Sequence, residues 1–371
     1  MNYSKQVPIT IPWTRIATWV VATRALLFLM AGLSLSVLPS GLAMGTPHSV
    51  WDAFFRWDSG WYWNILYHGY SFDPHQQSSV GFFPLYPALI WLLSLGRTID
   101  PKVVGFALSN AALCLACGYI WRLTMRRWKS QPTADLAVVL LLCGPVSFFF
   151  SIPYSEGLFL LATAGCLDAA ERKRWWEAGL WGFAAALTRS VGFVLVLPLL
   201  LHFITPWKSK RDWRQLGWAF LPVAGAALFV GYLWIAFGDA EAYFKVQRHW
   251  GRQLAWPWLA FETGMHNNGL APFYRILFNG TAIFAAVMLP LALVMRAPLS
   301  WVALVVVWPV LFTSSLLLDS LPRYLSIVVP YYPIVAAACG RWPVLTWPLI
   351  LWLNLLQMLC LALFVNGYWF V

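Results

Sequence analysis

The densest group of residues that could do chemistry lies between positions 51 and 62. It reads Trp-Asp-Ala-Phe-Phe-Arg-Trp-Asp-Ser-Gly-Trp-Tyr and places Asp58 between aromatic side chains. A carboxylate beside aromatic rings is partly desolvated, which suits it to accept a proton as a general base. Alternatively, Asp58 pairs with Arg56 or caps a helix, and its role is then structural.

Two further charged residues stand at breaks in apolar sequence. Glu156 follows Tyr154-Ser155 at a turn between two apolar stretches, where it either caps the next helix or belongs to a site. Arg189 interrupts a long apolar segment, and a charge at membrane depth is costly enough to suggest a function. Guanidinium groups suit phosphate oxygens, so we expect Arg189 to bind a lipid phosphate or, alternatively, to pair with Glu156.

Basic and aromatic residues mix again further along the chain. Lys245 and Arg248 precede a Trp-Pro-Trp sequence, and Arg323 begins a later apolar stretch. These cations could contact lipid head groups or line a substrate cleft, with Arg323 as an interface anchor or a second phosphate ligand.

The composition decides which environment must position these residues. The chain has 371 residues, of which 60% are hydrophobic and 11% charged, whereas soluble domains have about 25% charged residues. The sequence therefore predicts one all-α, polytopic membrane domain over residues 1–371. Its net charge of +11 fits basic cytoplasmic loops rather than nucleic-acid binding. No Walker A or G-x-G-x-x-G pattern indicates a nucleotide-binding domain.

Stretches of the length that spans a bilayer set the expected topology. We expect spans near 16–38, 103–121, 133–150, 156–170, 214–237, 273–296, 299–317, 323–340 and 342–366. Residues 82–95 are short and begin with prolines, and 177–203 break at Thr188-Arg189-Ser190.

The basic clusters indicate how these segments are threaded. With a cytoplasmic N-terminus, the clusters stay cytoplasmic only if 82–95 lie along the outer interface and 177–203 enter and return. The candidate residues then collect outside, mainly in the loops 39–102 and 238–272. We expect a plasma (inner) membrane protein with its site on the extracytoplasmic face.

At this point the motifs resemble a known family. Arg56-Trp57-Asp58, His68-Gly69-Tyr70, Tyr154-Ser155-Glu156, Thr188-Arg189-Ser190 and Arg323-Tyr324 follow its order and spacing over most of the chain. The sequence resembles the prokaryotic branch of the mannosyltransferases that add the second mannose of glycosylphosphatidylinositol anchors (phosphatidylinositol-glycan class V). The eukaryotic members have Asn where this chain has Val191.

The resemblance implies a C-type glycosyltransferase fold with external juxtamembrane helices and a broken re-entrant helix. It implies an inverting hexosyltransferase that uses a polyprenyl-phosphate sugar, such as dolichol phosphate mannose, and a lipid or glycan acceptor. Asp58 matches the acidic position near the donor, and Arg189 matches the basic residue of the broken helix. The hypothesis therefore makes Asp58 the base and assigns the donor phosphate to Arg189 and Arg323.

The remaining candidates would bind substrate: Arg56, Trp57, Trp61, Tyr62, His68, Tyr154, Glu156, Lys245 and Arg248. We expect no cofactor and no metal, because the spacing of Asp58, His68 and His75 matches no zinc motif. A transporter or flippase of a lipid-linked sugar would share a buried arginine and an aromatic cleft and is the alternative. An accessory subunit without catalysis is a third possibility.

Overall fold

The computed structural model describes residues 9–41, 47–205, 212–266, 272–315 and 318–368. These residues form helices joined by turns and loops, with one isolated bridge between Leu254 and Ser315. Five helical segments are long and apolar enough to cross a bilayer, and they include α1 (Trp13–Val37), α5 (Pro101–Trp128) and α13 (Pro272–Val294). The other two each begin with a short 3-10 turn: η4 (Trp213–Phe220) with α10 (Leu221–Phe237), and η5 (Pro343–Leu345) with α17 (Thr346–Val365). The chain is therefore an integral membrane protein.

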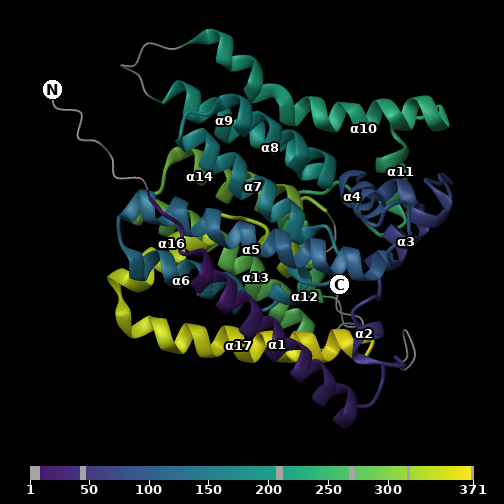
Figure 1. Cartoon of the computed structure of the whole chain (residues 1–371), viewed down its shortest axis with the longest axis horizontal. Coiled ribbons are helices and arrows are strands. Elements are labelled where there is room, and N and C mark those ends of the chain that lie inside the picture. The colour runs from purple at the N-terminus through teal and green to yellow at the C-terminus, as the bar shows by residue number, and fades with distance from the viewer. Residues whose placement is uncertain (1–8, 42–46, 206–211, 267–271, 316–317, 369–371) are drawn as a thin grey trace.

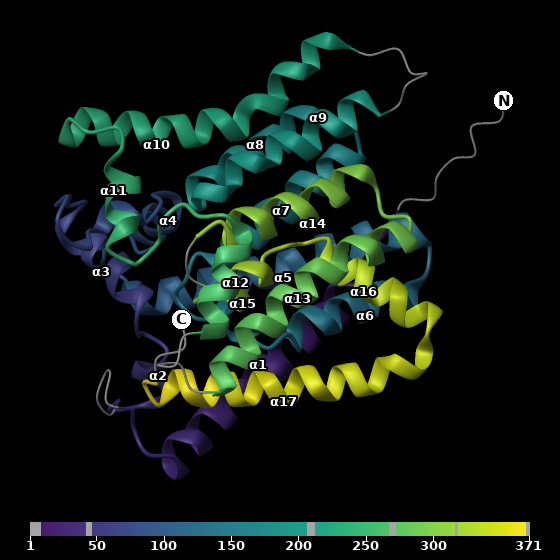
Figure 2. The same ribbon diagram turned by 180° about the vertical axis from the view of Figure 1, so that it is seen from behind.

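Shorter helices fill the space between these spans. The helices that pack inside the bundle are α6 (Gln131–Leu142), α7 (Glu156–Glu171), α8 (Trp175–Thr188), α9 (Val196–Ile204), α14 (Leu299–Thr313), α15 (Leu321–Ser326) and α16 (Tyr331–Arg341). Of these, α7 is the central element, since all its residues except the last are buried, and it packs against α5, α8 and α9. The last long helix, α17, lies beside the first, α1 (Figure 2).

One end of the bundle carries most of the short helices that lie outside the bundle. These are α2 (Val50–Ala53), α3 (Asp58–His68), η1 (Ser79–Gly81), α4 (Leu85–Leu93), α11 (Ala242–Arg248) and α12 (Pro257–His266). The helices α2, α3, α4 and α11 gather at the right-hand end of Figure 1. A helix of nine residues rises only about 13 Å, so α4 cannot cross the bilayer. This agrees with the expectation that 82–95 are not a span.

The expected break at Thr188-Arg189-Ser190 is confirmed. Helix α8 ends at Thr188, Arg189 is extended, and the chain continues as η3 (Ser190–Leu195) and α9. The rings of Trp175 and Phe203, at opposite ends of this segment, lie 5.5 Å apart, so the chain returns to the end where it entered. Only glycine permits the turn, because a Cβ at Gly192 would lie 2.4 Å from the backbone of α8.

Two expected spans are wrong in their extent. The span at 133–150 stops early, because α6 ends at Leu142 and only the 3-10 turn η2 (Ser147–Phe150) follows before α7. The span at 323–340 is divided into α15 and α16 around Pro330. Proline cannot donate to the helical ladder, which accounts for the second break. Pro145, preceded by Gly144, disfavours helix in the same way and accounts for the first.

Candidate active site

Asp58 begins α3 and follows a tight turn with an unusual backbone. Trp57 has φ 58° and ψ −117°, a region that favours glycine. The Ser59 amide donates to the Arg56 carbonyl at 3.4 Å and closes the turn. Such a conformation costs of order 1–3 kcal/mol and persists only where the surroundings hold it.

The surroundings that hold this turn come from the segment before α7. The Asp58 amide donates to the Tyr154 hydroxyl at 3.1 Å, and that hydroxyl donates to the Arg56 carbonyl at 2.9 Å. The Ser59 hydroxyl donates to the Pro153 carbonyl at 3.3 Å. Tyr154 is fully buried, so its hydroxyl fixes the start of α3 with little competition from water.

The charged side chains at this place form a continuous chain of ion pairs. Asp58 Oδ2 lies 2.7 Å from Arg323 Nη1, and Arg323 Nε lies 3.4 Å from Glu156 Oε1. Glu156 Oε1 also accepts from Arg189 Nη1 at 2.6 Å. The Glu156 and Arg323 side chains are only 1% and 5% exposed, whereas Asp58 keeps 27% exposure. Of the two carboxylates, Asp58 is therefore the one that a substrate could reach.

A third guanidinium, that of Arg252, joins this group from the loop between α11 and α12. Arg252 donates to the Tyr324 hydroxyl, and its guanidinium lies 5.0 Å from the centre of the Tyr324 ring. The Arg189 guanidinium lies 5.4 Å from the centre of the same ring. The sequence does not single out Arg252, which is one more cation in an aromatic-rich loop.

The side chains of the ion-pair chain, taken together with Arg252, have a positive balance of charge. Three guanidinium groups, from Arg189, Arg252 and Arg323, face the two carboxylates of Asp58 and Glu156. Burial lowers the pKa of Arg252 to about 10, so it remains a cation at neutral pH. An excess of buried cations suits an anionic ligand such as a phosphate.

The predicted substrate-binding residues divide into those near this cluster and those away from it. The Trp61 ring stacks on Phe82, with 5.8 Å between the ring centres, and lies edge-to-face with Trp250, with 5.7 Å between the ring centres. Tyr62 is buried beside Glu156, and burial together with that carboxylate raises the pKa of its phenol. Its hydroxyl therefore stays a hydrogen-bond donor at neutral pH.

Three of the predicted residues are not brought into the cluster. His68 is exposed at the far end of α3, about 15 Å along the helix from Asp58. Lys245 pairs with Asp239 at 2.5 Å, and Arg248 is exposed on α11. The roles proposed for these three side chains remain predictions. Among the described residues, no group of three His, Cys, Asp or Glu side chains gathers as a metal site.

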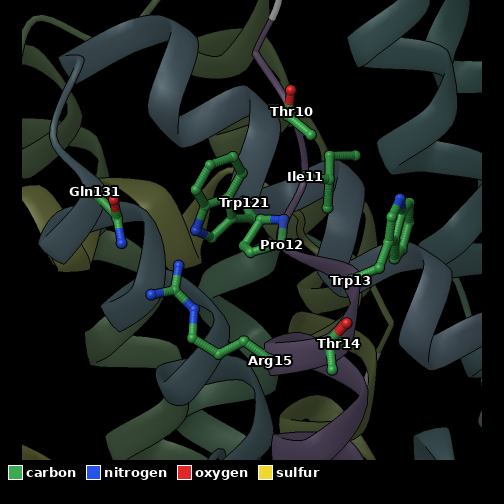
Figure 3. A pocket seen from close by; sticks show the side chains of 8 residues that line it. All are labelled: Thr10, Ile11, Pro12, Trp13, Thr14, Arg15, Trp121 and Gln131. Atoms are coloured by element: carbon green, nitrogen blue, oxygen red, sulfur yellow. The ribbon is translucent and has the colours of Figure 1, made fainter.

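A separate pocket lies at the opposite end of the bundle (Figure 3). It is lined by Thr10, Ile11, Pro12, Trp13, Thr14, Arg15, Trp121 and Gln131. Arg15, the cation in it, pairs with Asp135 at 2.8 Å, and Trp121 donates to the same carboxylate at 2.7 Å. This pocket contains none of the candidate site residues.

Comparison with known proteins gives the family. The family described as Mannosyltransferase (PIG-V) matches residues 21–206, just over half of the chain. The chain belongs to this family. The matched part holds Asp58, Tyr154, Glu156 and Arg189, whereas Arg252 and Arg323 lie beyond it. No curated protein sequence matches the chain.

Two solved structures share the fold of this family member at low sequence identity. ArnT from Cupriavidus metallidurans, bound to undecaprenyl phosphate, is 15% identical with a TM-score of 0.51 over 86% of this chain and 60% of that chain. The Archaeoglobus fulgidus oligosaccharyltransferase in the apo form is 12% identical with a TM-score of 0.50 over 95% and 56%. Both have the C-type glycosyltransferase fold, so that expectation is confirmed. The chain spans only about three fifths of their length.

Proposed function

We propose that the chain is an inverting glycosyltransferase that moves a mannose, or a similar hexose, from a polyprenyl-phosphate donor to a lipid or glycan acceptor. Membership of a mannosyltransferase family supports the reaction class. The observation that carries the mechanism is the Asp58 carboxylate, part-exposed and held at 2.7 Å by Arg323, beside two further guanidinium groups. A base for the acceptor and cations for a leaving phosphate thus lie side by side.

The reaction would be a single displacement. The acceptor hydroxyl oxygen attacks the anomeric carbon of the sugar, and its proton passes to the Asp58 carboxylate. The bond between the anomeric carbon and the phosphate oxygen breaks, and the electron pair leaves with the polyprenyl phosphate. The pairing of Oδ2 with Arg323 orients the Asp58 carboxylate for that transfer.

Cations near the leaving group would stabilise the charge that develops on the phosphate. Arg189 and Arg252 are best placed for this, because both lie against the Tyr324 ring and neither pairs directly with Asp58. Arg323 would contribute as well, although two carboxylates already share its guanidinium. We assign the sugar to the part-exposed aromatic rings of Trp57 and Trp61 on the same face.

The distribution of basic residues supports an extracytoplasmic site. Arg127, at the end of α5, donates to the Arg296 carbonyl after α13, and the cluster at 172–174 ends α7 at the same end of the bundle. Asp58 and its partners lie at the other end. Positively charged ends of membrane helices face the cytoplasm. This distribution supports a catalytic end on the outside, where a lipid-linked donor and its acceptor would meet.

The test compares the native chain with Asp58→Asn in detergent, with radiolabelled polyprenyl-phosphate mannose and a membrane-lipid extract. The amide keeps the shape of the side chain but cannot accept the proton, so transfer should fall by about 10²–10⁴-fold. Asp52→Asn is the matched control, since Asp52 lies in the same loop and its side chain bonds only to Ser49 among the described residues.

Two outcomes would contradict the proposal. Full transfer by Asp58→Asn would remove Asp58 as the base. Donor binding by the native chain without transfer to any lipid in the extract, and without release of free sugar, would favour a transporter of the lipid-linked sugar.

A further inference from the structure

Arg24 is a second arginine at membrane depth, and no part of the proposed mechanism uses it. It lies near the middle of α1 and is 6% exposed. None of its contacts in the described part of the chain is to a carboxylate. A buried membrane arginine is costly, so its contacts indicate what it stabilises.

In the described part of the chain, the Arg24 guanidinium bonds to its neighbour Thr23 and, through its two terminal nitrogens, to the end of α6 and the segment that follows it. Its nitrogens donate to the Leu142 carbonyl at 2.9 Å, the Ser147 carbonyl at 3.0 Å and the Ser151 hydroxyl at 3.1 Å. Gln357 of α17, 3% exposed, donates to the Leu142 carbonyl at 3.0 Å and the Gly144 carbonyl at 2.9 Å. Two polar side chains from the first and last long helices thus hold the same carbonyl group.

These contacts satisfy the carbonyl groups that are left free where α6 stops inside the membrane. Helix α6 has 12 residues and is about 18 Å long, which is well short of a bilayer core of about 30 Å. Carbonyl groups beyond its end need donors, because no water is present at that depth. Arg24 and Gln357 supply donors from two sides, and Asn110 of α5 supplies another to the Ser151 carbonyl at 2.9 Å.

The segment held in this way leads directly into the candidate site. Tyr154, which fixes the turn before Asp58, and Glu156, which joins Arg189 and Arg323, come three and five residues after Ser151. We propose that Arg24 and Gln357 are positioning residues that set the place of Tyr154 and Glu156 from the middle of the bilayer. The catalytic part of this inference rests on the proposed function, whereas the structural part does not.

Four variants of the protein test the inference. Arg24→Gln removes most of the donors, and Gln357→Leu removes two hydrogen bonds while keeping the arginine. Arg122→Gln is the matched control, because Arg122 bonds to the buried Asp168 at the opposite end of the same bundle. Arg24→Lys keeps a cation and some donors and should restore part of the activity.

The first measurement is hydrogen–deuterium exchange of residues 143–156 in detergent. Exchange should accelerate in Arg24→Gln and Gln357→Leu and stay native in Arg122→Gln. The second measurement is steady-state transfer. The kcat should fall at least about tenfold with an unchanged KM for the donor, since a misplacement of about 1 Å can cost on the order of a hundredfold in rate.

The outcomes separate the two claims. Native exchange in both Arg24→Gln and Gln357→Leu would overturn the inference whatever the enzyme does. Faster exchange with native kcat, or an equal fall of kcat in Arg122→Gln, would overturn the positioning role. A native chain that transfers no sugar would refute the proposed function, while the exchange measurement would still decide whether Arg24 and Gln357 hold the segment.

Discussion

The Tyr154 hydroxyl gives the sharpest test of how the candidate site is built. Tyr154→Phe keeps the ring, which lies 5.5 Å from the Arg323 guanidinium, and removes only the oxygen that joins the Asp58 amide to the Arg56 carbonyl. The variant therefore releases the strained turn at Trp57 without touching the ion pairs. Any loss of turnover would come through the position of Asp58.

The magnitude follows from the two hydrogen bonds. Each is worth about 0.5–1.5 kcal/mol, and leaving a buried partner unsatisfied costs about 1–3 kcal/mol. We therefore expect the free energy of unfolding to fall by about 2–4 kcal/mol. The turn itself stores about 1–3 kcal/mol of strain, so without the clamp it should relax. The kcat should then fall about 10- to 100-fold, since each 1.36 kcal/mol is a factor of ten.

Tyr86→Phe is the control that separates stability from catalysis. Tyr86 is as fully buried as Tyr154, and its hydroxyl also makes two bonds, to Ser109 at 2.8 Å and to the Gly105 carbonyl at 3.1 Å. Thermal melting in detergent and initial rates at saturating donor should show similar destabilisation in both variants and a lower kcat only in Tyr154→Phe. Equal kcat losses, or native kcat in Tyr154→Phe, would refute the reasoning.

Three further predictions concern the donor side of the site. Arg189→Ala should raise the donor KM about 10- to 100-fold, since a hydrogen bond to a charged group is worth about 1.5–3 kcal/mol. The control is Arg97→Ala, which removes an exposed cation stacked on Tyr67 and should leave the donor KM unchanged. Equal KM values in the two variants would count against the assignment. Gly81→Ala would place a Cβ 2.9 Å from the ring of Trp250. Trp250 comes two residues before Arg252, so a shift of this ring would also move Arg252. Overpacking of about 1.4 kcal/mol would raise the donor KM about tenfold, whereas Gly231→Ala meets no atom and serves as control. Burial raises the pKa of the Asp319 carboxyl, an effect that Arg252 opposes. As the pH falls through that raised pKa, Asp319 loses its charge and the surroundings of Arg252 become more positive, so the donor KM should decrease. Asp319→Asn should remove this pH dependence. A variant that keeps the native dependence of KM on pH would contradict the link between Asp319 and Arg252.

The sequence predicts the membrane elements well where hydropathy and charge agree. The runs of apolar residues locate α1, α5, α10, α13 and α17 within a few positions. The basic clusters on both sides of 177–203 predict the re-entrant segment, because only a returning chain keeps both clusters at one end. The early end of α6 has a sequence signal in Gly144-Pro145, which a reading by hydropathy alone overlooks. The donors to the carbonyl groups at this end come from Arg24 and Gln357, which are far away in the sequence.

The site is predicted in part for a similar reason. Asp58, Glu156, Arg189 and Arg323 stand at breaks in apolar sequence, and the structure brings all four together. Among the cations of the second external loop, the sequence offers no basis for a choice. Lys245 and Arg248 look as suitable as Arg252. The structure singles out Arg252, whose guanidinium donates to the side chains of Gln247 and Tyr324.

The pairing of the first and last long helices has a consequence for biosynthesis. Besides Gln357, Asn366 after the end of α17 also contacts α1. Its side-chain amide donates to the Ser34 hydroxyl at 2.7 Å, and its backbone carbonyl accepts from the Gly41 amide at 2.6 Å. A ribosome makes α1 more than 300 residues before α17, so the nascent chain waits in the membrane with these groups unsatisfied. Chains released before α17 is inserted would lack the donors that Gln357 contributes beside the candidate site. Insertion of α17, rather than insertion of the family-matched residues 21–206, is then the step that completes the support of the candidate site.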